Sequence, residues 1–109
     1  MESKTAVVAL GALAQETRLA IFRLLVEKGP EGLCASDIGA KLRLPPATLS
    51  FHLKELTRAG LLESRQEGRF IYYAPDFESM NDLVSYMTEN CCGGETCAPV
   101  RRKRKETVT

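Results

Sequence analysis

Three of the four cysteines stand close together near the end of the 109-residue sequence, at Cys91, Cys92 and Cys97. Thiolate sulfur is a soft donor that selects soft ions. Adjacent Cys91 and Cys92 can present two sulfurs, and Gly93-Gly94 lets the chain fold back so that Cys97 supplies a third. As(III) bonds three sulfurs in a pyramid, whereas zinc sites favour paired C-x2–4-C units and a fourth ligand. The spacing therefore predicts a three-sulfur site for As(III) or Sb(III).

Two other interpretations of this cysteine trio stay open. The thiols can form disulfides as a redox switch, or they can hold another soft metal such as cadmium, lead or zinc. The sequence has no signal-peptide pattern and no run of 18 apolar residues. We therefore expect a cytoplasmic protein with no membrane partner. Thiols in the cytoplasm are normally reduced, which argues against structural disulfides. Cys34 stands apart from the others, and a lone cysteine is more often a small buried apolar residue than a ligand.

Hydrophobic spacing predicts the elements that must position these groups. The segment at 6–14 is apolar and helix-prone but too short to stand alone, so it needs a partner. Further helices are predicted from apolar residues that recur at helical spacing, at 15–28, 36–42, 46–59 and 76–90. Strand-like runs at 62–66 and 69–74 flank Glu67-Gly68 and predict a hairpin. Two short helices followed by a hairpin predict a winged helix-turn-helix, mainly α with a β-hairpin wing.

Two details of these helices are also predicted from residue type. Ser36 is a good N-cap for the helix at 36–42. The helix at 15–28 is expected to bury one stripe, made of Leu19, Phe22, Leu25 and Val26. We expect one folded domain over 1–90, followed at 91–109 by a flexible tail that holds the cysteines and a basic run.

The helix at 46–59 has the pattern of a DNA-reading helix. Leu49, Leu53 and Leu56 form its buried stripe, so the opposite face is free to enter a major groove. Polar groups at its start can bond bases or phosphates, an exposed phenylalanine can meet a thymine methyl, and basic groups suit phosphates. The expected DNA contacts, including one arginine from the hairpin, are Thr48, Ser50, Phe51, His52, Lys54, Arg58 and Arg69. For His52, at the edge of the buried stripe, a packing role is the alternative to a phosphate contact.

The distribution of charge supports a nucleic-acid partner and argues against an enzyme. The net charge is only +1, but residues 41–75 carry six basic against three acidic side chains, and residues 101–105 read Arg-Arg-Lys-Arg-Lys. A basic patch of this kind is the usual footprint of a nucleic-acid surface. With a single histidine and no Gly-rich phosphate loop, the sequence offers no catalytic constellation and no site for an organic cofactor.

Together these segments resemble the ArsR/SmtB family of metal-responsive repressors. The resemblance is carried by the residues from Gly32 to Ile38, from Ala47 to Leu56, from Ala59 to Leu62 and from Gly68 to Tyr73. It implies a homodimer whose first and last helices form the interface, and an apo form that binds operator DNA until an inducer releases it. The trio Cys91, Cys92 and Cys97 resembles that of ArsR proteins whose sensing cysteines lie near the C-terminus. The family's best-known arsenic site uses two cysteines separated by one residue; here Cys34 matches the first and Ser36 occupies the second.

Overall fold

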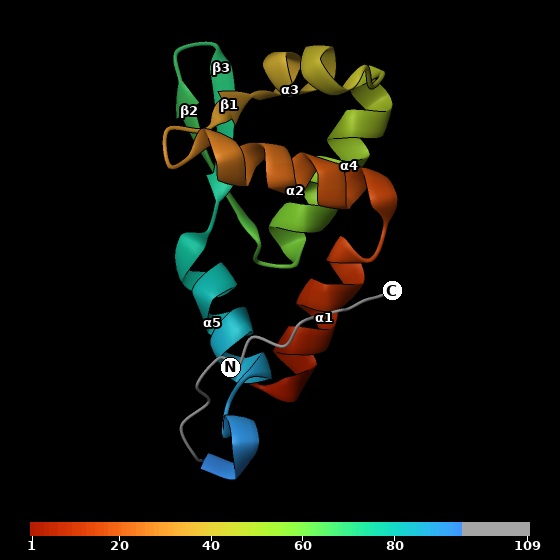
Figure 1. The fold of residues 1–109 in the computed structure, drawn as a ribbon. Helices are drawn as coiled ribbons and strands as arrows, with labels where there is room; N and C mark the ends of the chain where they lie inside the picture. Colours follow the sequence, from red (N-terminus) through yellow and green to blue (C-terminus); the bar gives the residue numbers. More distant parts are fainter. Residues whose placement is uncertain (95–109) are drawn as a thin grey trace, which may run out of the picture.

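The computed structural model describes residues 1–94, in which a small antiparallel sheet lies at one edge of a group of helices (Figure 1). The elements in chain order are α1 (Ser3–Leu13), α2 (Glu16–Lys28), β1 (Leu33–Cys34), α3 (Ala35–Leu42), α4 (Pro46–Arg58), β2 (Leu62–Glu67), β3 (Phe70–Pro75), α5 (Phe77–Met87) and the 3-10 turn η1 (Cys91–Gly94). Helices α3 and α4 form the helix-turn-helix, and β2 and β3 form the wing. The predicted fold class is confirmed.

The sheet has the strand order β1-β3-β2, with β1 as a strand that the sequence pattern did not predict. Its two residues are too few to show a period, and they pair with β3 through Leu33 opposite Tyr73. Gly32 precedes β1 with a φ of +73°, and a Cβ at this position would lie 2.4 Å from the carbonyl oxygen of Tyr73. Only glycine therefore lets β1 approach β3 so closely.

Helix α2 is packed against α1, α4 and β3. It buries Ile21, Phe22 and Leu25, whereas Leu19 is 44% exposed, so the prediction that Leu19 belongs to the buried stripe is wrong. A helix that packs against several elements buries residues on more than one side. Neighbours such as residues 21 and 22 can then both be buried, whereas a single buried stripe would leave one of them exposed. Within residues 1–94 no single helix has the length and hydropathy to cross a bilayer, although α1 and α2 pass that test as a pair bent by 99°.

Several helix boundaries differ from the predicted ones. Helix α1 begins at Ser3, before the apolar run, and α5 ends at Met87, shortly before Asn90 takes a positive φ of 57°. The N-cap of α3 is Cys34 and not Ser36, because β1 pairing holds Cys34 in an extended conformation directly before the helix. Ser36 lies in the first turn, with its Oγ 3.3 Å from the Sγ of Cys34.

Helices α1 and α5 are in contact at the end of the molecule opposite the hairpin tip (Figure 1). Ala6 and Ala9 of α1 and Leu83 of α5 are buried. Larger apolar side chains of both helices stay exposed, and we call them the α1/α5 face: Val7, Val8, Leu10, Val84 and Met87. An apolar surface of this kind marks an interaction site.

Candidate nucleic-acid interface

Helix α4 is held by its ends and by one buried face. Pro45 is extended and Pro46 occupies the first helical turn, where a missing N–H costs nothing. At the other end Gly60 has a φ of +82°, and the N–H of Leu61 donates to the carbonyl of Leu56 at 3.0 Å, which closes the helix. The face made of Leu49, Leu53 and Leu56 is buried, as predicted.

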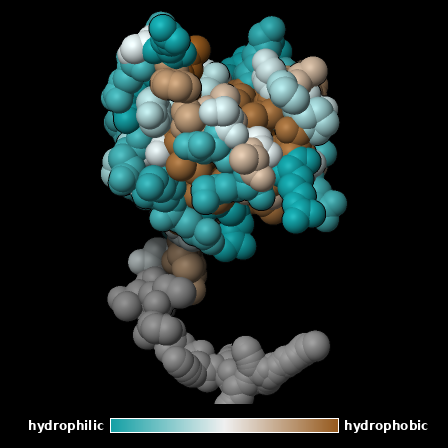
Figure 2. Space-filling model, turned by 90° about the horizontal axis from the view of Figure 1, so that it is seen from above, coloured by the Kyte–Doolittle hydropathy of each residue, from teal (hydrophilic) through white to brown (hydrophobic). Residues whose placement is uncertain are grey.

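The opposite face of α4 borders a groove between this helix and the sheet. The groove is lined by Ala47, Ser50, Phe51, Lys54, Thr57, Arg58, Ser64 and Tyr73. Thr48 is also exposed, and Phe51 is 55% exposed, which is unusual for a large aromatic ring. The side of the molecule seen from above shows apolar patches among hydrophilic residues (Figure 2). The groove thus brings together four of the residues expected to contact DNA, Ser50, Phe51, Lys54 and Arg58, while Thr48 is exposed on the same helix.

The two basic side chains of this face differ in their surroundings. Arg58 pairs with Glu55, with 3.2 Å between Nη1 and Oε2, and both side chains reach solvent. Within residues 1–94 no ion pair involves Lys54. Exposed pairs are worth little, so a phosphate can replace Glu55 as the partner of Arg58 at small cost.

His52 does not lie on this exposed face. Only 8% of its surface is exposed, and its Nδ1 lies 3.3 Å from Nη1 of Arg18 in α2. The ring meets Phe51 edge to face with 5.4 Å between centroids. Burial, and next the positive charge of Arg18, lower the pKa of His52 below 6.5, while Glu55 opposes them. This position does not fit the expected DNA contact and agrees with the packing alternative.

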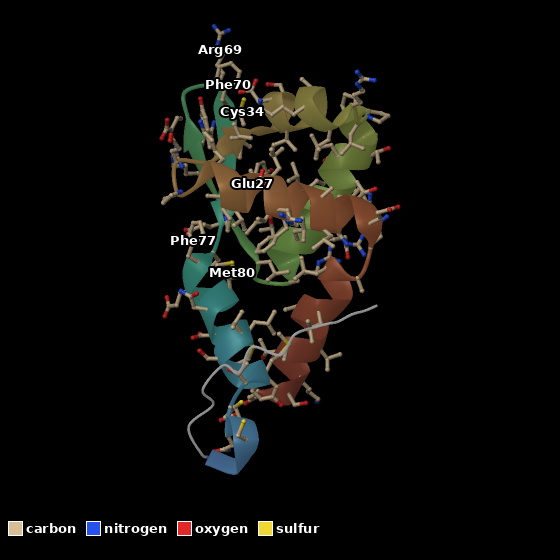
Figure 3. All side chains as sticks on the ribbon, in the orientation of Figure 1. Glu27, Cys34, Arg69, Phe70, Phe77 and Met80 are labelled. Atoms are coloured by element: carbon tan, nitrogen blue, oxygen red, sulfur yellow. The ribbon has the colours of Figure 1, made fainter. Side chains whose placement is uncertain are left out.

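Arg69 occupies a different edge of the molecule. Gly68 and Arg69 form the turn between β2 and β3, with glycine at the position of positive φ that a tight hairpin turn needs. Arg69 projects beyond the hairpin tip, with Phe70 beside it (Figure 3). Phe70 is 53% exposed and Ile71 44% exposed. The wing tip therefore presents apolar side chains with Arg69, which strand alternation alone did not predict.

The three cysteines within residues 1–94 lie at two opposite ends of the molecule. Cys34 is buried beside α3, whereas η1 with Cys91 and Cys92 follows α5 at the far end (Figures 1 and 3). Both Cys91 and Cys92 are exposed, and their Sγ atoms are 3.5 Å apart. Cys97 lies outside the described residues, and within residues 1–94 no three His, Cys, Asp or Glu side chains are grouped to hold a metal.

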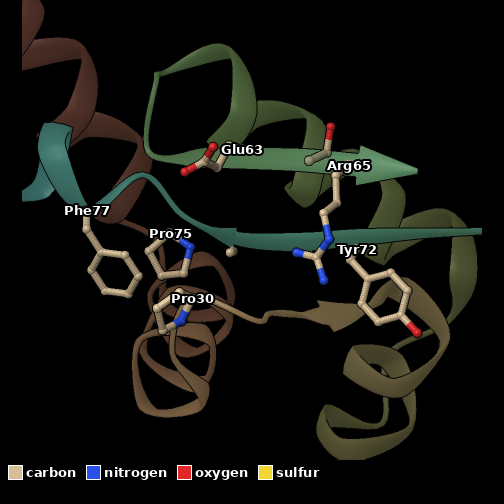
Figure 4. A pocket seen from close by; sticks show the side chains of 8 residues that line it. Pro30, Glu63, Arg65, Tyr72, Pro75 and Phe77 are labelled. Atoms are coloured by element: carbon tan, nitrogen blue, oxygen red, sulfur yellow. The ribbon is translucent and has the colours of Figure 1, made fainter. Parts of the chain in front are cut away.

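A small pocket beside the wing has a structural explanation. Its lining includes Pro30, Pro75 and Phe77 together with Arg65 and Tyr72 (Figure 4). The Arg65 guanidinium lies 5.0 Å from the centroid of the Tyr72 ring. It also donates to the carbonyl of Glu31 at 2.8 Å and pairs with Glu67. Arg65 thereby connects β2 and β3 to the loop before β1, so its role is to stabilise the wing.

Comparison with known proteins identifies relatives of this chain among transcriptional regulators. Residues 13–65 match a family described as a helix-turn-helix domain. An uncharacterized HTH-type transcriptional regulator of Methanocaldococcus jannaschii is 32% identical over 72% of this chain and 85% of its own length. The arsenical resistance operon repressor of Bacillus subtilis is 35% identical over 74% of this chain and 73% of its own. A cadmium resistance regulatory protein CadC homolog of Staphylococcus aureus is 36% identical over 67% of this chain and 59% of its own.

Solved structures agree with these relatives. Reduced HlyU from Vibrio cholerae superposes with a TM-score of 0.64 at 30% identity, over 83% of this chain and 92% of that one. The homodimeric winged helix-turn-helix domain of a possible ArsR-family regulator from Mycobacterium bovis gives 0.63 at 26% identity, over 86% and 87%. These are DNA-binding regulators and not enzymes. The chain accordingly belongs to the ArsR/SmtB family of helix-turn-helix transcriptional regulators.

Proposed function

We propose that this regulator is a repressor that leaves its operator when As(III) or Sb(III) binds the thiolates of Cys91, Cys92 and Cys97. The observation that carries the proposal is the pair of exposed sulfurs at the end of α5, 3.5 Å apart. Two soft donors so close together supply most of a pyramidal three-sulfur site, and Cys97 follows Cys92 by five positions in the sequence. The name of the Bacillus subtilis relative, an arsenical resistance operon repressor, supports this choice of inducer.

The α1/α5 face supports a homodimer as the working form. The Mycobacterium bovis relative is described as homodimeric. In a twofold dimer the two α4 helices must match half-sites about 34 Å apart, one turn of DNA. Closure of a three-sulfur site directly after α5 repacks the interface and alters that spacing. The inducer then favours a dimer that does not fit the operator.

On the DNA side, the proposed contacts are the exposed groups of α4 and the wing. Thr48, Ser50 and Phe51 face base edges, and Lys54, Arg58 and Arg69 face phosphates or the adjacent groove. Their exposure and the groove along α4 support this assignment. The buried His52 is left out of it.

Replacing Lys54 by glutamine is expected to weaken DNA binding about equally for specific and random duplexes. Each phosphate contact releases counterions, so the plot of log affinity against log salt should lose about 0.9 from its slope per site. The measurement is a fluorescence-anisotropy salt series. The control Lys4→Gln removes the same charge from α1, and it should leave the slope unchanged. Equal slopes for both variants would remove Lys54 from the contact set.

The test of the inducer site uses single Cys→Ser variants at 91, 92 and 97. Each should bind operator DNA like the wild type and should no longer be released by arsenite or antimonite. Cys34→Ser is the matched control, because Cys34 is buried at the other end of the protomer. It should respond like the wild type. Arsenite release that survives in all three tail variants refutes the proposal.

The same titration distinguishes arsenite sensing from a second candidate function of the cysteines. The contact between the Cys91 and Cys92 sulfurs also suits a thiol-redox switch or a cadmium sensor, and the Staphylococcus aureus relative is named for cadmium resistance. Release by peroxide that a reductant reverses, without any effect of arsenite, supports the redox switch. Release by cadmium alone supports the metal alternative.

A further inference from the structure

Arg18 joins three helices through a single side chain. It lies in the first turn of α2, where its own N–H donates to the Gln15 side chain at 2.8 Å. Its Nε donates to the carbonyl oxygen of Ala12, in the last turn of α1, at 2.7 Å. Its Nη1 lies 3.3 Å from the Nδ1 of His52, on the buried side of α4. The rigid guanidinium therefore connects α1, which carries part of the α1/α5 face, to the DNA-reading helix.

The chemistry of this link defines the protonation state of His52. An arginine side chain stays protonated and can only donate hydrogen bonds, so Nδ1 of His52 must offer a lone pair. His52 is then neutral, with its proton on Nε2. A second proton, on Nδ1, would place two N–H groups against each other and break the link to Arg18.

We propose that Arg18 is a positioning residue that fixes the position of α4 relative to α1. Protonation of His52 breaks the link between Arg18 and α4 and thereby weakens DNA binding. The proposal rests on DNA binding through α4 and does not depend on the inducer. The charged groups that act on His52 within residues 1–94 are Arg18 from α2 and Glu55 from α4. Arg58 and Glu55 also line the crevice where Arg18 meets α1, whose lining residues there are Val8, Gly11 and Ala12.

The expected pH dependence has a definite sign. Burial and Arg18 lower the pKa of His52 in the folded protein below its ordinary value of 6.5. The unfolded chain then binds more protons than the folded one as the pH falls through this window, so stability is lost on acidification and is fully present above pH 6.5. DNA affinity should fall in the same direction. A histidine that contacted phosphate would show the reverse, because its positive charge would strengthen binding in acid.

The test measures DNA affinity at about pH 7.5 and about pH 5.5, a range in which histidine is the side chain that normally titrates. The probe is a duplex of about 30 base pairs, selected by the wild-type protein from a random pool. Arg18→Gln should bind about tenfold more weakly at the higher pH, as expected for one lost charge-assisted hydrogen bond, and should show no further fall in acid. Arg23→Gln is the matched control, since Arg23 is an exposed arginine of the same helix whose one ion pair within residues 1–94 is with Glu27 at 3.7 Å.

A second variant separates positioning from simple loss of packing. His52→Asn keeps an acceptor near the place of Nδ1 but cannot titrate. It should bind within about twofold of the wild type at the higher pH and lose the acid dependence. Urea unfolding of each variant at both pH values verifies that the domain is folded. Because the sequence contains one histidine, its 15N resonances report directly whether Nδ1 is unprotonated.

The outcomes are distinct. A protonated Nδ1 at neutral pH overturns the proposal, as does an Arg18→Gln protein that is folded and keeps the affinity and pH profile of the wild type. Affinity that rises in acid also overturns it. Failure of the wild type to select any duplex would instead contradict DNA binding itself.

Discussion

Replacement of Gly32 by alanine is expected to destabilise the fold by about 3 kcal/mol, a large part of the stability of so small a domain. The φ of +73° is unfavourable for alanine, and its Cβ would lie 2.4 Å from the carbonyl oxygen of Tyr73 and 3.0 Å from the carbonyl carbon. Both atoms belong to the backbone of β3, so no side-chain rotation relieves the contact. The variant must move β1 away from β3 and, with it, Cys34 at the start of α3.

Urea unfolding at fixed protein concentration checks this expectation, because the midpoint of the proposed dimer would depend on concentration. Gly60→Ala is the matched control. Gly60 also has a positive φ, of 82°, but a Cβ there meets nothing within 4 Å. The Gly60→Ala variant should lose only about 1 kcal/mol of unfolding free energy, the cost of the left-handed conformation. Equal losses for the two variants would show that β1 and β3 separate easily.

Val84→Glu is expected to produce a folded monomer and to weaken operator binding by about 100-fold. Val84 is 52% exposed in the protomer and belongs to the α1/α5 face. In a twofold dimer each substitution occurs in both copies, so two carboxylates would enter an apolar interface without partners. A monomer also loses the advantage of binding two half-sites at once. Analytical ultracentrifugation and DNA titration measure the two effects.

Asp82→Lys provides the control for Val84→Glu. Asp82 is exposed and, at 100° per residue, lies on the opposite side of α5 from Val84. It changes the charge of the helix by more than the test variant does, and we expect the dimer to survive. A Val84→Glu protein that remains dimeric would place the interface outside the α1/α5 face.

The exposed face of α4 illustrates what periodicity alone can predict. Leu49, Leu53 and Leu56 recur at helical spacing, so the direction of Ser50, Phe51 and Lys54 toward solvent follows from helix geometry. Pro45 and Pro46 at the start of the helix and Gly60 after it define its ends through local conformation. Such features depend on residues near in sequence, and they agree with the structure.

Other features depend on residues that are far apart in sequence. Leu19 is exposed and Ile21 buried because α2 is covered by three different elements. The contact of Arg18 with His52 joins positions separated by 34 residues. Nothing in either local pattern indicates that a basic side chain in one helix will meet the inner face of another.

The sequence by itself determined the winged helix-turn-helix, the exposed face of α4 and the pair of sulfurs after α5, because helical period, turn residues and adjacency along the chain are local properties. Only the tertiary structure decided that His52 turns inward to Arg18, that β1 joins the wing, and that Cys34 lies at the opposite end from Cys91. These arrangements depend on which surfaces pack together, and packing is a property of the whole chain.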